Sequence, residues 1–486
     1  MSCTTILVGS KASYDGSTII ARNDDGSFAP KKMIVNKKNQ SSKYKCQISK
    51  LEIELPKKSY KYTSTPSVSK DKGLWPACGI NEKNVAMTAT ETITSNPLVK
   101  GADPLVVYDK AKKKVGGIGE EDFLTIVLPY ISCAREGVIR TGELLEKYGT
   151  YECNGIAFAD EKEIWWLETI GGHHFIATKV PDDKVVIMPN SFGTDHFDLK
   201  DAFSKQENNI CSKDLKSFIK DNHLDTTNNG IFNPRIIFGS HSDQDHLYNT
   251  PRSWYMMKYF NPTKINWNAT TYTPTSDNLP FCIIPERKVT IEDIKYILSS
   301  HYQSTEYDPY SKSNKAGAYR SIGVPNSDDS GILQIRPYMP KELKGIEWMS
   351  LGGSSFTACF PQYVNVENFD SYISKTSKEV NTNYLYWSSR IIAVLTDAQY
   401  NKSVMETERY VSQVFNESYR ILNEYDKKML KSKDYSLCKE ANTKIITMLT
   451  SKSNAVLDKV LENASNGMKT RYHRGDNWYN TIEIWD

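Results

Sequence analysis

Cys3 stands near the start of the chain, where it can become the N-terminal residue of a mature protein. The thiolate is the form of cysteine that attacks carbonyl carbons, and an ordinary thiol is mostly protonated at neutral pH. Cleavage of the Ser2–Cys3 bond would free an α-amine whose pKa of about 7.7–8 lets it accept the thiol proton. Cys3 would then carry both the nucleophile and the base for amide hydrolysis. A small buried cysteine at the start of an edge strand is the alternative interpretation.

Two strand-like runs frame this cysteine, at residues 3–8 and 18–25, with the turn-forming pair Asp15-Gly16 between them. A tight hairpin at that turn sets Arg22 opposite Gly9. The spacing therefore predicts that Arg22 lies in the same sheet as Cys3, but it does not predict contact between them.

Arg22 and Asp25 have the charges that such a nucleophile needs. Arginine stays protonated at ordinary pH, so Arg22 would favour the Cys3 thiolate by direct attraction. Asp25 could hold the freed ammonium in place. A surface ion pair between Arg22 and Asp24 would explain the same residues without any catalysis.

Short motifs follow one another in order from Cys3 to Asn190. They are Cys3-Thr4-Thr5, Asp15-Gly16-Ser17-Thr18, Arg22-Asn23-Asp24-Asp25, residues 79–91, residues 101–106, Asn154-Gly155-Ile156-Ala157, residues 165–174 and Met188-Pro189-Asn190. In this order they resemble the cysteine dipeptidase family (dipeptidase A type) of N-terminal nucleophile hydrolases, which is related to penicillin V acylase, bile-salt hydrolase and acid ceramidase. The resemblance implies an αββα sandwich, in which two antiparallel sheets lie between helical layers. It also implies contact between Arg22 and Cys3, and self-processing in which the Cys3 thiol attacks the Ser2 carbonyl and Met1-Ser2 is removed.

The resemblance assigns roles to residues farther along the chain as well. Asn190 matches an asparagine that donates to the oxyanion in the acylase relatives, although a turn asparagine is the alternative. The late arginine of those relatives matches Arg252 best, and Arg235 competes with it. Glu91 stands where bile-salt hydrolases carry an asparagine, and a carboxylate there could pair with the free α-ammonium of a peptide. This departure favours a dipeptidase over an acylase.

The pattern of the remaining chain indicates an α+β protein with sheets at its centre. Strands are expected at residues 51–55, 84–89, 155–159, 164–168, 174–178 and 184–188, and helices at 119–134 and at 140–148, the latter with Thr141 as its cap. Residues 311–329 read as an exposed polar loop. Apolar spacings of three, four and seven after residue 380 predict amphipathic helices. We expect a catalytic domain at 1–380 and a mainly helical region at 381–486, which packs on the core or at the interface of a homo-oligomer.

Composition narrows the possible partners. The 486 residues are 39% hydrophobic and 24% charged, which is typical of a soluble globular protein. Lysine plus arginine exceed aspartate plus glutamate by 61 to 58, and a net charge of +3 gives no reason to expect nucleic acid. The sequence shows no secretory or membrane-spanning segment, so we expect a cytoplasmic protein without a membrane partner. We expect a small peptide as substrate and no cofactor.

Histidines at 173, 174, 241 and 246 offer a competing metal-site interpretation. The chain has no HExxH motif, and neighbouring histidines on a strand point to opposite faces. We therefore expect no catalytic metal.

Three functions fit the sequence. The leading one is a cysteine dipeptidase that hydrolyses short unblocked peptides through an acyl-enzyme on Cys3. An N-acyl amide hydrolase of the penicillin or bile-acid acylase type is the second, and a non-enzymatic secernin-like protein is the third. An enzyme is favoured over the non-enzymatic protein because the chain keeps all four candidate site residues, Cys3, Arg22, Asp25 and Asn190.

Overall fold

Two antiparallel sheets form the centre of the molecule. The computed structural model describes residues 2–26, 29–69, 73–227, 230–267 and 270–468. The seven-stranded sheet has the order β14 (Cys282–Ile283), β12 (Val185–Met188), β1 (Ser2–Val8), β2 (Thr18–Asp25), β15 (Asp329–Ile335), β16 (Gly345–Leu351) and β17 (Phe360–Tyr363). The six-stranded sheet has the order β13 (Asn209–Cys211), β11 (His174–Lys179), β10 (Ile164–Ile170), β9 (Asn154–Ala159), β8 (Ala86–Thr92) and β7 (Cys78–Ile80). Two small ribbons pair β3 (Ile34–Asn36) with β6 (Tyr62–Ser64) and β4 (Lys43–Lys45) with β5 (Glu52–Glu54).

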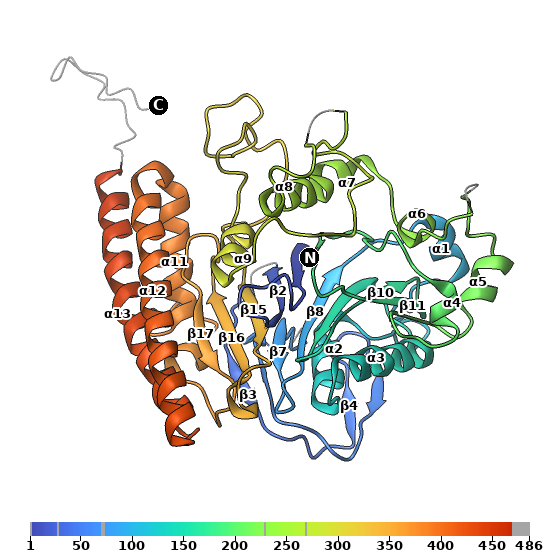
Figure 1. The fold of residues 1–486 in the computed structure, drawn as a ribbon, viewed down its shortest axis with the longest axis horizontal. Coiled ribbons are helices and arrows are strands. Elements are labelled where there is room, and N and C mark those ends of the chain that lie inside the picture. The colour runs from blue at the N-terminus through green and yellow to red at the C-terminus, as the bar shows by residue number, and fades with distance from the viewer. Residues whose placement is uncertain (1, 27–28, 70–72, 228–229, 268–269, 469–486) are drawn as a thin grey trace.

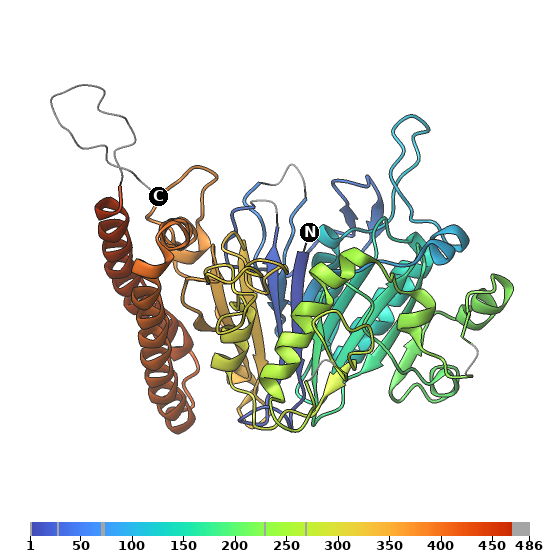
Figure 2. The ribbon, with the colours of Figure 1, turned by 90° about the horizontal axis from the view of Figure 1, so that it is seen from above.

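Helices cover the outer faces of both sheets (Figures 1 and 2). The six-stranded sheet packs against α2 (Glu120–Val127) and α3 (Ala134–Tyr148). The seven-stranded sheet packs against α8 (Thr250–Phe260), α9 (Ile291–Leu298), α11 (Leu385–Ala398), α12 (Tyr400–Ser432) and α13 (Leu437–Asn466). The short helices are α1 (Pro97–Ala102), α4 (Leu199–Ala202), α5 (Leu215–Asp221), α6 (Pro234–Phe238), α7 (Asp243–Tyr248) and α10 (Ser371–Ser374), with 3-10 turns at Leu128–Tyr130 and Lys341–Leu343. The predicted α+β sandwich is confirmed.

Alternation along the strands fills two separate cores. Ala157 and Trp166 face the seven-stranded sheet and join the larger core, whereas Phe158 and Trp165 face α2 and α3 and join the second. Successive side chains of a strand point to opposite faces, so β9 and β10 each contribute to both cores. The core between the two sheets is mainly apolar, and polar side chains enter it near Cys3.

The hairpin of β1 and β2 has a different register from the predicted one. Arg22 pairs with Thr5 and Asp24 with Cys3, whereas a tight turn at Asp15-Gly16 predicts Arg22 opposite Gly9. The reason is the connection, because β1 ends at Val8 and β2 begins only at Thr18, so the strands are joined by a longer loop and not by a tight turn at Asp15-Gly16. The register moves Arg22 towards Cys3.

Two helix boundaries also differ from prediction. The helix expected at 119–134 ends at Val127, followed by a 3-10 turn that contains Pro129, because proline disrupts a continuing helix. The helix expected at 140–148 already begins at Ala134. Thr141 is consequently a buried interior residue of α3 and not its cap.

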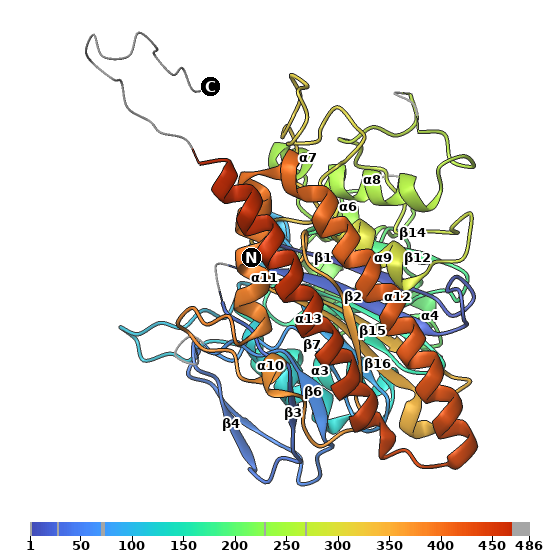
Figure 3. The ribbon, with the colours of Figure 1, turned by 90° about the vertical axis from the view of Figure 1, so that its left-hand side faces the viewer.

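The C-terminal helices α11, α12 and α13 lie together along one side of the molecule (Figure 3). Their apolar faces belong to the same core as the seven-stranded sheet, as Phe415 on α12 shows by its packing on Trp348 of β16. The predicted helices are present, and residues 469–486 of the predicted region lie outside the described residues. The division at residue 380 stays a prediction. No helix in the described part of the chain combines the length and apolar character needed to cross a membrane.

Glu347 on β16 predicts a measurable pH dependence of stability. Its side chain is fully buried. Burial raises the pKa of Glu347 to about 8. Because an unfolded glutamate has a pKa of about 4.3, the folded state holds this proton more tightly, and stability is lost as the pH rises from about 4.5 to 8.

Glu347→Gln should remove that loss, since an amide mimics the protonated carboxyl. We expect the variant to match wild type near pH 5 and to exceed its free energy of unfolding by about 1–4 kcal/mol at pH 8. Denaturant unfolding at both pH values measures this, with the exposed Glu54→Gln as the matched control. An identical pH dependence in wild type and Glu347→Gln would refute the assignment.

Candidate active site

Cys3 lies inside the seven-stranded sheet with its thiol between the two sheets. Its side chain has 0% exposure, and its Sγ accepts a hydrogen bond from Arg22 Nη2 at 2.9 Å. Its backbone N–H donates to Asn190 Oδ1 at 3.3 Å. The Ser2–Cys3 bond is intact here and Ser2 belongs to β1, so the nitrogen of Cys3 is an amide and not an amine.

Acidic groups surround Arg22 and, with it, the thiol. Arg22 Nη2 lies 2.5 Å from Glu120 Oε1 and 3.5 Å from Asp24 Oδ1. Burial is the largest influence on the Cys3 thiol and raises its pKa well above the usual range, and the nearby carboxylates of Glu91, Glu120 and Asp24 add to this, while Arg22 opposes it. The thiol is therefore protonated in the chain that retains this bond.

One group of possible metal ligands comes together among the described residues. It consists of Cys3, Asp24 and Glu120, whose ligand atoms lie within 4.8 Å of one another. Arg22 already contacts all three side chains. The positive charge between these groups therefore comes from the chain itself. Asp24 is further paired with Lys31 at 2.6 Å, and although burial disfavours its charged form, Lys31 and Arg22 hold the pKa of Asp24 below its usual range.

Asp25 points to the other face of β2, away from the thiol. One of its oxygens accepts from Arg320 Nη2 and the other from Ser327 Oγ, each at 2.5 Å. Arg320 lies in the segment 311–329 that we had expected to be an exposed loop. That expectation is wrong in part, because the end of the segment, Ser327 to Asp329, is buried beside β2. Asp25 lines the cleft described below without a contact to the Cys3 nitrogen in this state.

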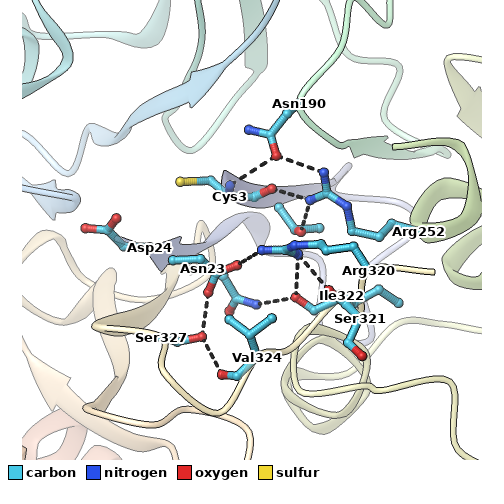
Figure 4. Close-up of polar contacts among 12 residues, drawn as sticks. Cys3, Asn23, Asp24, Asn190, Arg252, Arg320, Ser321, Ile322, Val324 and Ser327 are labelled. Atoms are coloured by element: carbon cyan, nitrogen blue, oxygen red, sulfur yellow. Dashed lines mark hydrogen bonds and ion pairs between the residues drawn. The ribbon is translucent and has the colours of Figure 1, made fainter. Parts of the chain in front are cut away.

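Arg252 connects the sheet to α8. Its Nη1 donates to the Cys3 carbonyl oxygen at 2.5 Å and to Thr4 Oγ1 at 2.8 Å, and its Nη2 donates to Asn190 Oδ1 at 2.8 Å (Figure 4). Burial, aided by repulsion from Arg320, lowers the pKa of Arg252 to about 10, so it remains charged at neutral pH. The other candidate arginine, Arg235, instead donates to the carbonyl oxygens of Gly193 and Leu279. The structure thus brings Arg252 to Cys3 and leaves Arg235 elsewhere.

Asn190 is held in place from several directions. Its Nδ2 donates to Thr92 O at 2.9 Å, while its Oδ1 accepts from both Cys3 N and Arg252. Asn249 Oδ1 accepts from Asn190 N at 3.1 Å and from Arg252 Nη2 at 2.8 Å. These bonds set the side-chain amide of Asn190 beside the nucleophile.

Glu91 reaches the space between the sheets through an irregularity of β8. The pairing of β8 with β9 shifts between Ala89 and Glu91, and such a bulge turns the following side chain to the other face. Glu91 Oε2 accepts from Thr5 Oγ1 at 2.9 Å, and burial raises its pKa to about 8. The side chain is fully buried, so in this state it lies near Cys3 without lining the cleft.

A cleft of about 1180 Å³ opens next to this cluster. Asn190 and Thr92 lie on its wall, and Asn190 also contacts the Cys3 nitrogen. The remaining wall comes from residues 94–97 with Lys100, from residues 239–242, 244–245 and 248–249, from Asp25 with Gly26, and from Asn326. Cys3 itself does not line the cleft, as its side chain is fully buried.

The histidines are placed otherwise than predicted. His173 and His174 were expected to point to opposite faces, yet both Nδ1 atoms contact Asp103, at 2.8 Å and 2.7 Å. The reason is that His173 belongs to a turn and β11 begins only at His174. Asp245 forms the capping box of α7, and His246 contacts Asp277 at 3.0 Å.

Three neighbours of the site were not found from the sequence. Glu120 lies in the first turn of α2, and nothing in the sequence signals its pairing with Arg22. Asn249 stands three residues before Arg252 in the sequence, and this short spacing is the signal that could have placed it at the site. Arg320 is nearly 300 positions from Asp25 along the chain, and nothing in its surroundings points to that pairing.

Comparison with known proteins identifies the family of this chain. The family "Peptidase family C69" matches residues 2–413. The chain is 50% identical over 444 residues to a "Dipeptidase" of Bifidobacterium longum, covering 88% of this chain and 83% of the relative. It is 45% identical over 484 residues to a "Probable dipeptidase A" of Streptococcus pyogenes serotype M3 (98% and 100%), and 41% identical over 469 residues to "Dipeptidase A" of Lactobacillus helveticus (95% and 94%). The chain therefore belongs to peptidase family C69, and it is a peptidase.

Proposed function

We propose that this peptidase is a dipeptidase whose nucleophile is Cys3, freed as an N-terminal residue by cleavage of the Ser2–Cys3 bond. The observation that carries the proposal is the placement of Cys3, with Arg22 on its sulfur and Asn190 on its nitrogen. The names of the relatives, all of them dipeptidases or probable dipeptidases, support the substrate class.

The intact chain is inactive in this account for two reasons. Its Cys3 nitrogen is an amide that cannot accept a proton, and its thiol is buried with a pKa well above the usual range. Cleavage creates an α-amine next to the sulfur and removes the segment that precedes it. The amine can then take the thiol proton, and Arg22 stabilises the thiolate that results.

Hydrolysis follows in two halves. The Cys3 sulfur attacks the substrate carbonyl carbon, and Asn190 donates to the oxygen that becomes negative. An amide NH₂ carries two hydrogens, of which Thr92 O takes one, so the second is available to the oxyanion. The tetrahedral intermediate collapses to a thioester as the Cys3 ammonium protonates the leaving amine. Water then attacks the thioester, the Cys3 amine accepts a proton from the water, and the sulfur leaves.

Arg252 and Asp25 act as positioning residues in this proposal. Arg252 fixes the Cys3 carbonyl oxygen and Asn190, which holds the nucleophile and the oxyanion donor in one arrangement. Asp25, fixed by Arg320, lies at the end of the strand beside the start of β1 and can attract the new ammonium. The catalytic machinery lies within residues 1–380, and the helical region supports the seven-stranded sheet or a subunit interface.

Glu91 is proposed to recognise the substrate's α-ammonium once the preceding segment has left. A cation beside this buried carboxyl would favour its ionised form, whereas an N-acetyl group would leave it unpaired. Mismatches of this kind at a polar site cost several powers of ten in kcat/KM. The pairing would therefore select unblocked peptides.

We expect free dipeptides to be cleaved at least about a hundredfold faster than their N-acetyl forms. Glu91→Gln should narrow this gap, mainly by slowing cleavage of the free peptide. The measurement is kcat/KM for a dipeptide, its N-acetyl analogue and an acyl-glycine, with wild type, Glu91→Gln and the exposed control Glu54→Gln. Preference of the wild type for the acylated substrates would replace the dipeptidase by an acylase.

A further inference from the structure

Lys100 stands alone in the wall of the cleft. It is the only lysine or arginine among the described residues that line it, and its side chain is exposed. No described carboxylate lies within ion-pair distance of its ammonium. Two aspartates share the cleft wall, but Asp25 is paired with Arg320 and Asp245 caps α7.

The backbone under Lys100 is firmly anchored. Asn96 caps α1 by accepting from Val99 N at 3.0 Å and donates to Ile237 O at 2.7 Å. Val99, next to Lys100, is fully buried. α1 follows β8 directly, and Thr92 at the end of β8 accepts from Asn190. The lysine is thus carried by a fixed element that continues from the wall of the active site.

The size of the cleft alone does not restrict the length of the peptide that it can hold. Its volume of about 1180 Å³ exceeds the roughly 300–1,000 Å³ of ordinary small-ligand pockets. A dipeptide spans only about 7 Å when extended, so space alone would not exclude longer peptides. A cation in the wall of the cleft would instead select peptides whose C-terminal carboxylate comes within its reach.

We propose that Lys100 binds the C-terminal carboxylate of the substrate and thereby limits the enzyme to dipeptides. This inference rests on the proposed dipeptidase function. The carboxylate belongs to the leaving amino acid, so Lys100 acts while the acyl-enzyme forms and has no partner once that amino acid has departed. Amidation of the C-terminus, or one more residue, removes the carboxylate from its reach.

The test compares a dipeptide, its C-terminal amide and the tripeptide extended by one residue at the C-terminus. We expect wild type to prefer the free dipeptide. Lys100→Met, which keeps the aliphatic stem, should lower kcat/KM for the free dipeptide about tenfold to a hundredfold, the range expected of a charged hydrogen bond. The amide and the tripeptide should change by less than about twofold, because neither uses the lost charge.

Two controls separate charge from other effects. Lys100→Arg keeps the cation and should retain most of the preference, and Lys216→Met, at an exposed lysine of α5, should behave as wild type. An unchanged ratio of dipeptide to amide in Lys100→Met would overturn the inference, as would an equal loss on all three substrates. Either result leaves the dipeptidase function standing, whereas a wild type that cleaves no dipeptide overturns both.

Discussion

Replacement of Cys3 by serine should lower kcat/KM for dipeptides by roughly a thousandfold or more, with the fold unchanged. Serine differs from cysteine by one atom, but its hydroxyl is a much weaker nucleophile at the same amine pKa. The variant should unfold with the same cooperativity as wild type, since the serine oxygen at position 3 can make the same packing contacts as the cysteine sulfur. Steady-state kinetics with several dipeptides, together with thermal unfolding, measures the two parts of the prediction.

Incomplete processing could imitate this loss, so both proteins should be made with residue 3 directly after the initiating methionine. Ordinary removal of that methionine then exposes residue 3 without self-cleavage. Cys46→Ser serves as the matched control, because Cys46 is a buried thiol that belongs to the second core. Wild-type turnover by the Cys3→Ser protein would exclude Cys3 as the nucleophile.

Asn190→Ala should lower kcat by about a hundredfold to a thousandfold, with a much smaller change in KM. Loss of a single oxyanion donor has this effect because the interaction strengthens as charge develops in the transition state. The substitution also removes the acceptor of Cys3 N and Arg252, so the effect should lie towards the upper end. Single-turnover kinetics on the protein with exposed Cys3 measures it.

Asn365→Ala, at an exposed asparagine outside the site, provides the control. If Asn190 serves only the folded structure, its loss should lower the melting temperature and leave kcat of the folded enzyme close to wild type. That outcome would remove Asn190 from the chemistry and require another donor for the oxyanion.

Local patterns in the sequence predicted the strands well. β2 spans Thr18–Asp25 as expected, because its apolar and β-branched run is bounded by clear turn residues. The C-terminal helices were equally visible, since their apolar spacing persists over several turns. The sandwich itself came from the resemblance, as periodicity identifies strands without stating which of two sheets each one joins.

The site was harder to predict, because it depends on irregular backbone and on distant contacts. The Cys3–Arg22 contact requires a register that the loop between the strands sets, and loop length does not follow from the turn motif alone. Glu91 faces Thr5 only because of the bulge in β8, which no residue of the motif announces. The pairing of Arg22 with Glu120 joins segments about a hundred positions apart, so it needed the folded structure.

The intact mass of the purified, active protein is the sharpest test of Cys3 as an N-terminal nucleophile. We expect a chain that begins at Cys3, and we expect a Cys3→Ala protein produced in the same way to keep Ser2. When the wild type is mixed with a dipeptide and the reaction is quenched within one turnover, the N-terminal fragment of the protein should be heavier by one acyl group. An active protein that retains Ser2 would exclude the N-terminal nucleophile mechanism, because its Cys3 nitrogen would still be an amide.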